Sequence, residues 1–124
     1  MTREELQALV KEKYGIAPDY PFDLDFETAV FRHVSSRKWF GIIIRIPKSR
    51  LGLEGDEVID IVNFKCDPEV IYSLACAESG IFRAYHMNKA HWLSVALDGS
   101  CDDDTVTWLL DISYELTKPR GRVK

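Results

Sequence analysis

The chain has 124 residues, of which 46% are hydrophobic and 29% charged, and its formal net charge is −4 at pH 7. This length suits one domain with a single core, and the composition is typical of a globular protein. The acidic balance argues against a general polyanion binder, so any nucleic-acid contact needs a local patch of positive charge. The longest apolar run, residues 39–44, is too short to cross a bilayer, and we expect no membrane partner.

The cysteines and the N-terminal sequence bear on the cellular compartment. The chain has three cysteines, Cys66, Cys76 and Cys101. Their odd number, their wide spacing and the lack of a C-x-x-C pair favour reduced thiols over a disulfide or a zinc site. The first five residues, MTREE, are acidic where a signal peptide would be basic and then apolar. We therefore expect a cytoplasmic protein that holds no metal or cofactor.

The first half of the chain predicts one helix followed by three strands. Residues 2–14 place apolar side chains at spacings of three and four, and they begin with the capping-box pattern T-x-x-E. A loop over residues 16–25 follows. Strands are expected at about 28–34, 38–46 and 57–65, and the near-continuous apolar pattern of the second predicts cover on both faces. Residues 48–56 suit a long hairpin tip.

The second half predicts a helix, two strands and a last helix. Asp67, Pro68 and Glu69 give a strong helix start, and Gly80 is the expected end. Strands at about 82–87 and 91–97 would be joined by a tight turn at 88–90, and a helix would run from about 102 to 116.

The resulting order is αβββαββα. Connections of hairpin length imply antiparallel pairing, so the class is α+β, with a sheet of about five strands and flanking helices. We expect a single domain over residues 1–117 and a basic, disordered tail over 118–124.

Several motifs, in order and spacing, resemble one known family over nearly the whole chain, from about Leu6 to Thr117. They are IAPDYPF (16–22), RH (32–33), KWFG (38–41), NFKCDP (63–68), YHMNK (85–89), HW (91–92), DG (98–99) and SYELT (113–117). Together they are similar to the MmcQ/YjbR family.

The resemblance implies a compact α+β fold, related in shape to secretion chaperones. It also implies a proposed "double-wing" DNA-binding role, in which two β-hairpins act as the wings; that proposal rests largely on shape. The chain departs from the family at Arg83, where proline is common, and at Ser36-Arg37, where Asn-Lys is common. Both departures add a guanidinium near a motif and favour an anionic partner.

The favoured hypothesis is a DNA-binding module without catalysis, in which lysines and arginines on the wings contact phosphates and aromatic rings stack on bases. The basic tail would act as an anchor that does not depend on DNA sequence. The candidate site residues are Arg32, Lys38, Trp39, Lys65, Arg83, Tyr85, Asn88, Lys89 and Trp92, and Arg37 adds a further cation.

Each candidate also has a structural interpretation. A tryptophan in a domain of this size usually packs against the core. We therefore favour core or half-buried sheet positions for Trp39 and Trp92 over a base-stacking role. Asn88 is a common residue to start a turn. His86 and His91 would approach across the tight turn, but no third ligand is present, which favours structural roles over a metal pair. A buried, bonded imidazole is favoured for His33.

Cys66 precedes a helix, where a thiol can become reactive, but a buried apolar role is favoured. No catalytic motif is present, so we expect no enzyme.

Two alternatives to DNA binding stay open. One is a protein-interaction or chaperone-like module, which could self-associate and for which a large exposed apolar patch would count. The other, ranked last, is a small-ligand pocket around His86, Asn88 and Lys89.

Overall fold

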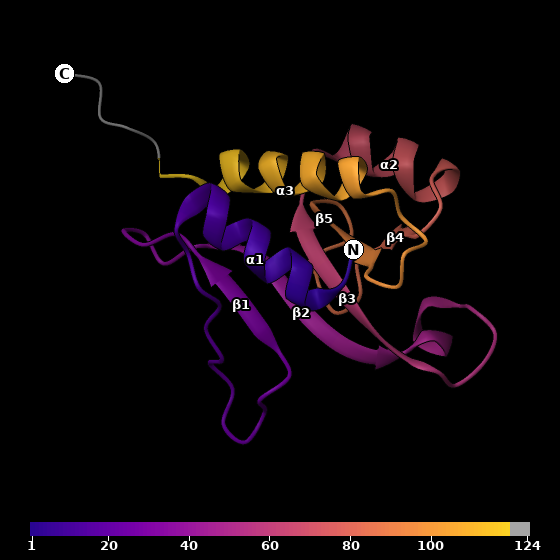
Figure 1. The fold of residues 1–124 in the computed structure, drawn as a ribbon. Coiled ribbons are helices and arrows are strands. Elements are labelled where there is room, and N and C mark those ends of the chain that lie inside the picture. The colour runs from indigo at the N-terminus through magenta and orange to yellow at the C-terminus, as the bar shows by residue number, and fades with distance from the viewer. Residues whose placement is uncertain (120–124) are drawn as a thin grey trace.

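A five-stranded antiparallel sheet in the order β1-β2-β3-β5-β4 forms the centre of the molecule, and three helices lie beside it (Figure 1). The computed structural model describes residues 1–119. The elements are α1 (Arg3–Tyr14), β1 (Ala29–Arg32), β2 (Trp39–Pro47), the 3-10 turn η1 (Lys48–Leu51), β3 (Val58–Lys65), α2 (Pro68–Ala77), β4 (Ile81–Arg83), β5 (Trp92–Ala96) and α3 (Asp103–Thr117). The α+β class and the order of helices and strands are confirmed.

Most helix ends follow the sequence signals, but α2 ends at Ala77 and not at Gly80, and the Asp67 side chain makes no capping hydrogen bond at its start. Thr2 and Glu5 form the capping box, since each side chain bonds the other's backbone N–H, at 3.1 and 2.9 Å. Gly15 ends α1 in the left-handed conformation with φ 68°. Asp102 caps α3 by accepting the Thr105 N–H.

One face of the sheet packs against the helices and holds the main core. Cross-strand partners share a face, and the row of Ala29, Ile43, Val62, Val95 and Ile81 runs across all five strands on the helix side. The central residues of β2 are buried on both faces, as its sequence pattern predicts.

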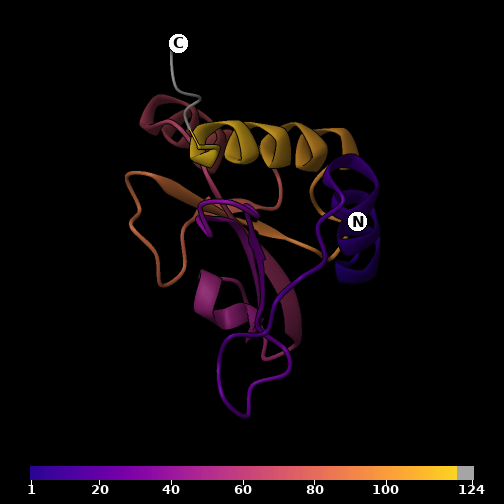
Figure 2. The same cartoon turned by 90° about the vertical axis from the view of Figure 1, so that its left-hand side faces the viewer.

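The opposite face carries a smaller apolar cluster that connecting segments cover. Ile46, Ile59, Ile61 and Ala96 are buried there, and Leu51 of η1, Phe82 and Tyr85 pack against them. Figure 2 shows the helices on one side of the sheet, and η1 together with the segment between β4 and β5 on the other. These two connections form the walls of the candidate site described below.

The predicted tight turn between the fourth and fifth strands is wrong. β4 ends at Arg83, and residues 84–91 form a longer loop. The cause is a buried polar pair, Asn63 and Ser94, both fully buried, whose side chains need partners. Tyr85 provides them: its N–H donates to Ser94 Oγ and its carbonyl accepts from Asn63 Nδ2, each at 2.9 Å. These bonds take the backbone of Tyr85 out of the strand ladder.

The first strand is also shorter than residues 28–34. It ends at Arg32, because a turn closes at His33, whose carbonyl accepts the Arg37 N–H at 3.0 Å while Arg37 adopts a positive φ of 64°.

Of the predicted basic tail, Lys118 is described and its Nζ lies 3.8 Å from Glu115 Oε2, whereas residues 120–124 lie outside the described residues. Among the helices of residues 1–119, none combines the length and the apolar character needed to cross a membrane.

Candidate functional site

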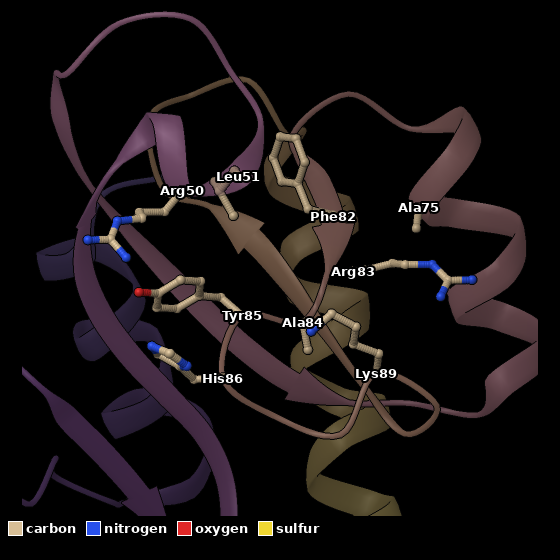
Figure 3. Close-up of a pocket in the computed structure, with 9 residues that line it drawn as sticks. All are labelled: Arg50, Leu51, Ala75, Phe82, Arg83, Ala84, Tyr85, His86 and Lys89. Atoms are coloured by element: carbon tan, nitrogen blue, oxygen red, sulfur yellow. The ribbon is translucent and has the colours of Figure 1, made fainter.

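A hollow of about 420 Å³ opens beside β4, on the side of the sheet that η1 and the loop 84–91 cover (Figure 3). We call it the basic hollow. Three cations reach it from three connections or strands: Arg50 from η1, Arg83 from the end of β4 and Lys89 from the loop 84–91. The other lining residues are Leu51, Ala75, Phe82, Ala84, Tyr85 and His86.

The aromatic wall of the basic hollow is fixed by the buried polar pair beneath it. Ser94 Oγ donates to Asn63 Oδ1 at 2.5 Å, which completes the set of bonds that holds the Tyr85 backbone. The Tyr85 ring is half-buried against the smaller apolar cluster. Figure 3 shows this ring extending toward the wall that carries Arg50 and Leu51. The position of Tyr85 is therefore set by the fold before any ligand arrives.

His86 holds an uncommon backbone conformation at the edge of the basic hollow. Its φ is +57°, a region that residues with a Cβ rarely occupy, and its ring lies 4.0 Å from that of Tyr85, centroid to centroid. Strained residues of this kind cluster at binding and catalytic sites. The conformation turns the chain so that Tyr85 and Lys89 line the same hollow.

The positive charge in the basic hollow is not offset by neighbouring carboxylates. Among residues 1–119, six lysines and arginines have no carboxylate oxygen within 4.0 Å: Lys11, Lys38, Arg50, Lys65, Arg83 and Lys89. Three of the six line the basic hollow. Cations gathered over a low-dielectric surface without counter-charges attract anions.

A smaller hollow of about 290 Å³ continues this surface toward α2. It is lined by Pro68, Ile71, Tyr72, Arg83, Lys89 and Ala90. Arg83 and Lys89 line both hollows, so they form the ridge between them. Together the two hollows make a cationic surface with half-buried Tyr85 on one side of the ridge and exposed Tyr72 on the other.

The structure brings together three of the nine residues that the sequence proposed for binding: Arg83, Tyr85 and Lys89. Asn88 does not line the basic hollow. Its Oδ1 accepts the Ala90 N–H at 2.8 Å and its carbonyl accepts the Trp92 N–H at 2.9 Å, so it forms the turn that its residue type suggested.

Near the β1 edge of the sheet, Arg32 ends β1 opposite Trp39, which begins β2, and Lys38 directly precedes Trp39. The Arg32 guanidinium lies 5.4 Å from the Trp39 ring centroid and is paired with Asp19 at 2.9 Å, which offsets its charge. Lys38 is exposed beside them. β2 has nine residues, so this end lies roughly 30 Å along the strand from η1.

Lys65 and Trp92 are direct cross-strand partners on β3 and β5, and both are half-buried. The backbone N–H of Lys65 donates to Ser113 Oγ at 2.8 Å, which ties the end of β3 to α3. The tryptophans thus occupy the half-buried sheet positions that the packing argument favoured, and neither lines the basic hollow.

Sequence reasoning missed Arg50 and Phe82 as site residues. Arg50 stands in a segment that the sequence describes only as a hairpin tip, and nothing local shows that η1 folds back over the sheet. One sequence signal could have indicated that η1 packs on the sheet: Leu51, next to Arg50, is apolar and favours burial. In the structure it packs in the smaller apolar cluster with Phe82 and Tyr85.

The remaining titratable candidates have structural positions. His33 is buried and its Nε2 lies 2.8 Å from Thr117 Oγ1. Burial raises the pKa of the Cys66 thiol, which makes it a poor nucleophile. His86 and His91 are both exposed. Within residues 1–119, no three histidine, cysteine, aspartate or glutamate side chains are grouped so that they could hold a metal ion.

These features define an α+β protein with a cationic, partly aromatic hollow on the side of its sheet that η1 and the loop 84–91 cover. The family model for YjbR matches residues 3–116, so the chain belongs to the YjbR family.

Individual relatives agree with this assignment. YyaQ, an uncharacterized protein of Bacillus subtilis, is 42% identical over 118 residues, which cover 95% of this chain and 99% of that protein. The uncharacterized YjbR of Escherichia coli K12 is 41% identical over 54 residues, 44% of this chain and 46% of that protein. A crystal structure of a Pseudomonas syringae protein has a TM-score of 0.91 and 36% identity, covering 95% of this chain and all of that one.

Proposed function

We propose that this protein binds DNA without catalysing a reaction, and that Arg50, Arg83 and Lys89 contact its phosphates. One observation supports the proposal above all: half of the cations without a nearby carboxylate in residues 1–119 line one hollow. Charge-assisted bonds from arginine and lysine to phosphate are among the strongest hydrogen bonds that proteins make.

The location of these cations agrees with the two-wing arrangement that the family resemblance suggests. Arg50 belongs to the connection between β2 and β3, and Lys89 belongs to the connection between β4 and β5. Arg50 and Lys89 therefore sit on two hairpin connections that both line the basic hollow, and Arg83 ends β4 beside the second of them. Acidic groups elsewhere on the chain would repel a polyanion and so favour this one orientation.

The test compares two variants that lose the same charge from different places. Arg83→Gln with Lys89→Gln removes two cations from the ridge, whereas Lys11→Gln with Lys38→Gln removes two exposed cations from outside it. Binding of a fluorescently labelled 20-nucleotide DNA is measured by anisotropy at low salt. We expect the ridge variant to lose at least tenfold in affinity and the control variant less than threefold. Equal losses would mean that net charge, and not this site, governs binding.

A second candidate function, self-association, is favoured by a different surface. The loop from Tyr20 to Glu27 protrudes away from the helices (Figure 1). Its apolar side chains are exposed, Leu24 at 92% and Phe26 at 80%, and acidic residues alternate with them. Its charge is opposite to that of the basic hollow, so a second copy of the chain offers a complementary partner.

Light scattering after gel filtration tests this second candidate. If the loop occupies the hollow of another copy, a dimer or larger species is expected at high protein concentration, and the variant with Leu24→Ser and Phe26→Ser should be a monomer. A wild-type chain that stays monomeric at millimolar concentration would rule self-association out.

A further inference from the structure

We propose that the basic hollow recognises single-stranded DNA by taking in one unpaired base, which packs against Tyr85 while the flanking phosphates lie on Arg83 and Lys89. This inference rests on the proposed function and adds the form of nucleic acid that the site selects. Four features of the hollow support it: its concave shape, its volume, its fixed aromatic wall and the placement of its cations.

Shape separates a single strand from a duplex. Proteins read a duplex by inserting a convex element, such as a helix or a β-ribbon, into a groove. Here the aromatic groups line a concavity, and the surface between its walls recedes. A duplex, whose bases are stacked and paired, can reach the cations from outside but cannot place a base inside. A single strand can rotate one base out of its stack and insert it.

The volume fits a ligand of the size of one base with its sugar. Small-molecule sites range from about 300 to 1,000 Å³, and the basic hollow has about 420 Å³. The adjoining hollow of about 290 Å³, on the far side of the Arg83 and Lys89 ridge, extends the path of the strand toward Tyr72. Tyr72 is 72% exposed and provides a second ring for a neighbouring base.

The aromatic wall is preorganised for stacking. The backbone of Tyr85 is held on both sides, by Ser94 and by Asn63, and both partners are fully buried. Phe82 lines the same hollow and packs with Tyr85 on the smaller apolar cluster. A ring that is already fixed loses little conformational entropy when a base packs on it, so more of the stacking energy appears as affinity.

The cations are placed to hold the backbone of the strand rather than its bases. Arg83 and Lys89 form a ridge between the two hollows, so a strand with one base on each side passes its phosphates over them. Arg50 and Tyr85 both line the basic hollow, and in Figure 3 their side chains extend in the same direction. A guanidinium in that position can also lie against the face of an inserted base.

The first experiment varies the ligand and leaves the wild-type protein unchanged. Three labelled probes are compared at one low salt concentration: a 12-nucleotide single strand, the same sequence as a blunt duplex, and a single strand of equal length in which an abasic sugar replaces every nucleoside. The abasic strand keeps every phosphate, so it isolates the contribution of the bases. We expect the intact single strand to bind at least tenfold more tightly than the duplex and roughly 5- to 100-fold more tightly than the abasic strand.

The second experiment varies the aromatic wall. Tyr85→Leu removes the ring and should lose roughly 5- to 100-fold in affinity for the intact strand, while its affinity for the abasic strand should stay within twofold of wild type. Tyr85→Phe keeps the ring and should bind like wild type. Comparing the variants on both strands separates stacking from a general loss of folding, because an unfolded variant loses both ligands.

The outcomes separate this inference from the function on which it depends. If the duplex and the abasic strand bind as tightly as the intact single strand, base insertion is wrong, while phosphate binding at the ridge stands. If no probe binds in a way that depends on Arg83 and Lys89, both proposals fail together. If Tyr85→Leu weakens the intact and abasic strands equally in a folded protein, Tyr85 does not stack on a base and the inference is overturned.

Discussion

At the scale of single residues, two buried polar side chains decide the shape of the candidate site. Asn63 and Ser94 stand opposite each other on β3 and β5, where an apolar pair would have continued the sheet's packing. Because both are fully buried, they must find hydrogen-bond partners, and they find them in each other and in the backbone of Tyr85. The loop that lines the basic hollow is therefore attached to the sheet by polar bonds.

Replacing Ser94 by alanine should destabilise the protein and loosen this loop. The Tyr85 N–H and Asn63 Oδ1 would both lose a partner in a buried setting, which costs about 1–3 kcal/mol. Urea denaturation followed by circular dichroism gives the free energy of unfolding. Ser73→Ala, at an exposed position on α2, is the control and should stay within about 0.5 kcal/mol of wild type. Equal unfolding energies for both variants would contradict this role for Ser94.

His33 should make stability depend on pH. Burial lowers its pKa below the ordinary value of 6.5, because the charged imidazolium is poorly solvated beside Phe40 and Tyr114. The unfolded chain then binds the proton more readily than the folded one. The stabilising contribution of neutral His33 is complete above pH 6.5 and is lost as the pH falls toward the folded-state pKa.

Unfolding energies at pH 7.5 and pH 5.5 test this dependence. We expect wild type to lose more stability between the two values than His33→Gln, whose amide can still bond Thr117 and does not titrate. The other titratable groups are present in both proteins. Any difference between the two proteins in how the free energy of unfolding changes with pH is therefore due to His33. Parallel slopes would show that His33 has the same pKa in both states.

At the scale of elements, the turn before β4 depends on a glycine, at a position where any side chain would be strained. Gly80 has φ +79°, and a Cβ placed on it would lie 2.8 Å from the backbone nitrogen of Cys101. Both the backbone conformation and the close approach disfavour a side chain. The absence of a side chain lets the start of β4 approach the segment that leads into α3.

Gly80→Ala and Gly99→Ala separate these two effects. Gly99 also has a positive φ, +89°, but a Cβ there would meet no atom within 4 Å. We expect Gly99→Ala to lose roughly 1–2 kcal/mol from the strained backbone alone. Gly80→Ala should lose clearly more, since the backbone of Cys101 must also move. Thermal unfolding followed by circular dichroism checks the order, and a Gly80→Ala variant as stable as Gly99→Ala would contradict it.

The elements that the sequence predicted well are those whose signals are local. The capping box at Thr2, the proline start of α2 and the aspartate cap of α3 all depend on neighbours within four residues. β4 and the loop after it were predicted poorly, because their ends depend on Asn63, about 20 residues away in sequence. Long-range hydrogen bonds of this kind leave no periodic pattern in the chain.

At the scale of the whole molecule, the fold sorts the cations into two groups. Arg3, Arg32 and Lys48 lie close to carboxylates, whereas Arg50, Arg83 and Lys89 lie together without them. The sequence could name Arg83, Tyr85 and Lys89 because they share one motif-rich segment. The sequence could not show that Arg50 belongs to the candidate site or that Arg32 is paired with Asp19. Both facts depend on which distant segments the fold brings together.

The most direct test of the central claim is the salt dependence of binding to single-stranded DNA. Each phosphate contact releases counterions, so the logarithm of the binding constant should fall with the logarithm of salt concentration at a slope of about −0.7 per contact. Three contacts, from Arg50, Arg83 and Lys89, predict a slope near −2 for wild type. The variant with Arg83→Gln and Lys89→Gln should retain about −0.7. A slope that is the same in both proteins would show that the basic hollow does not contact the phosphates.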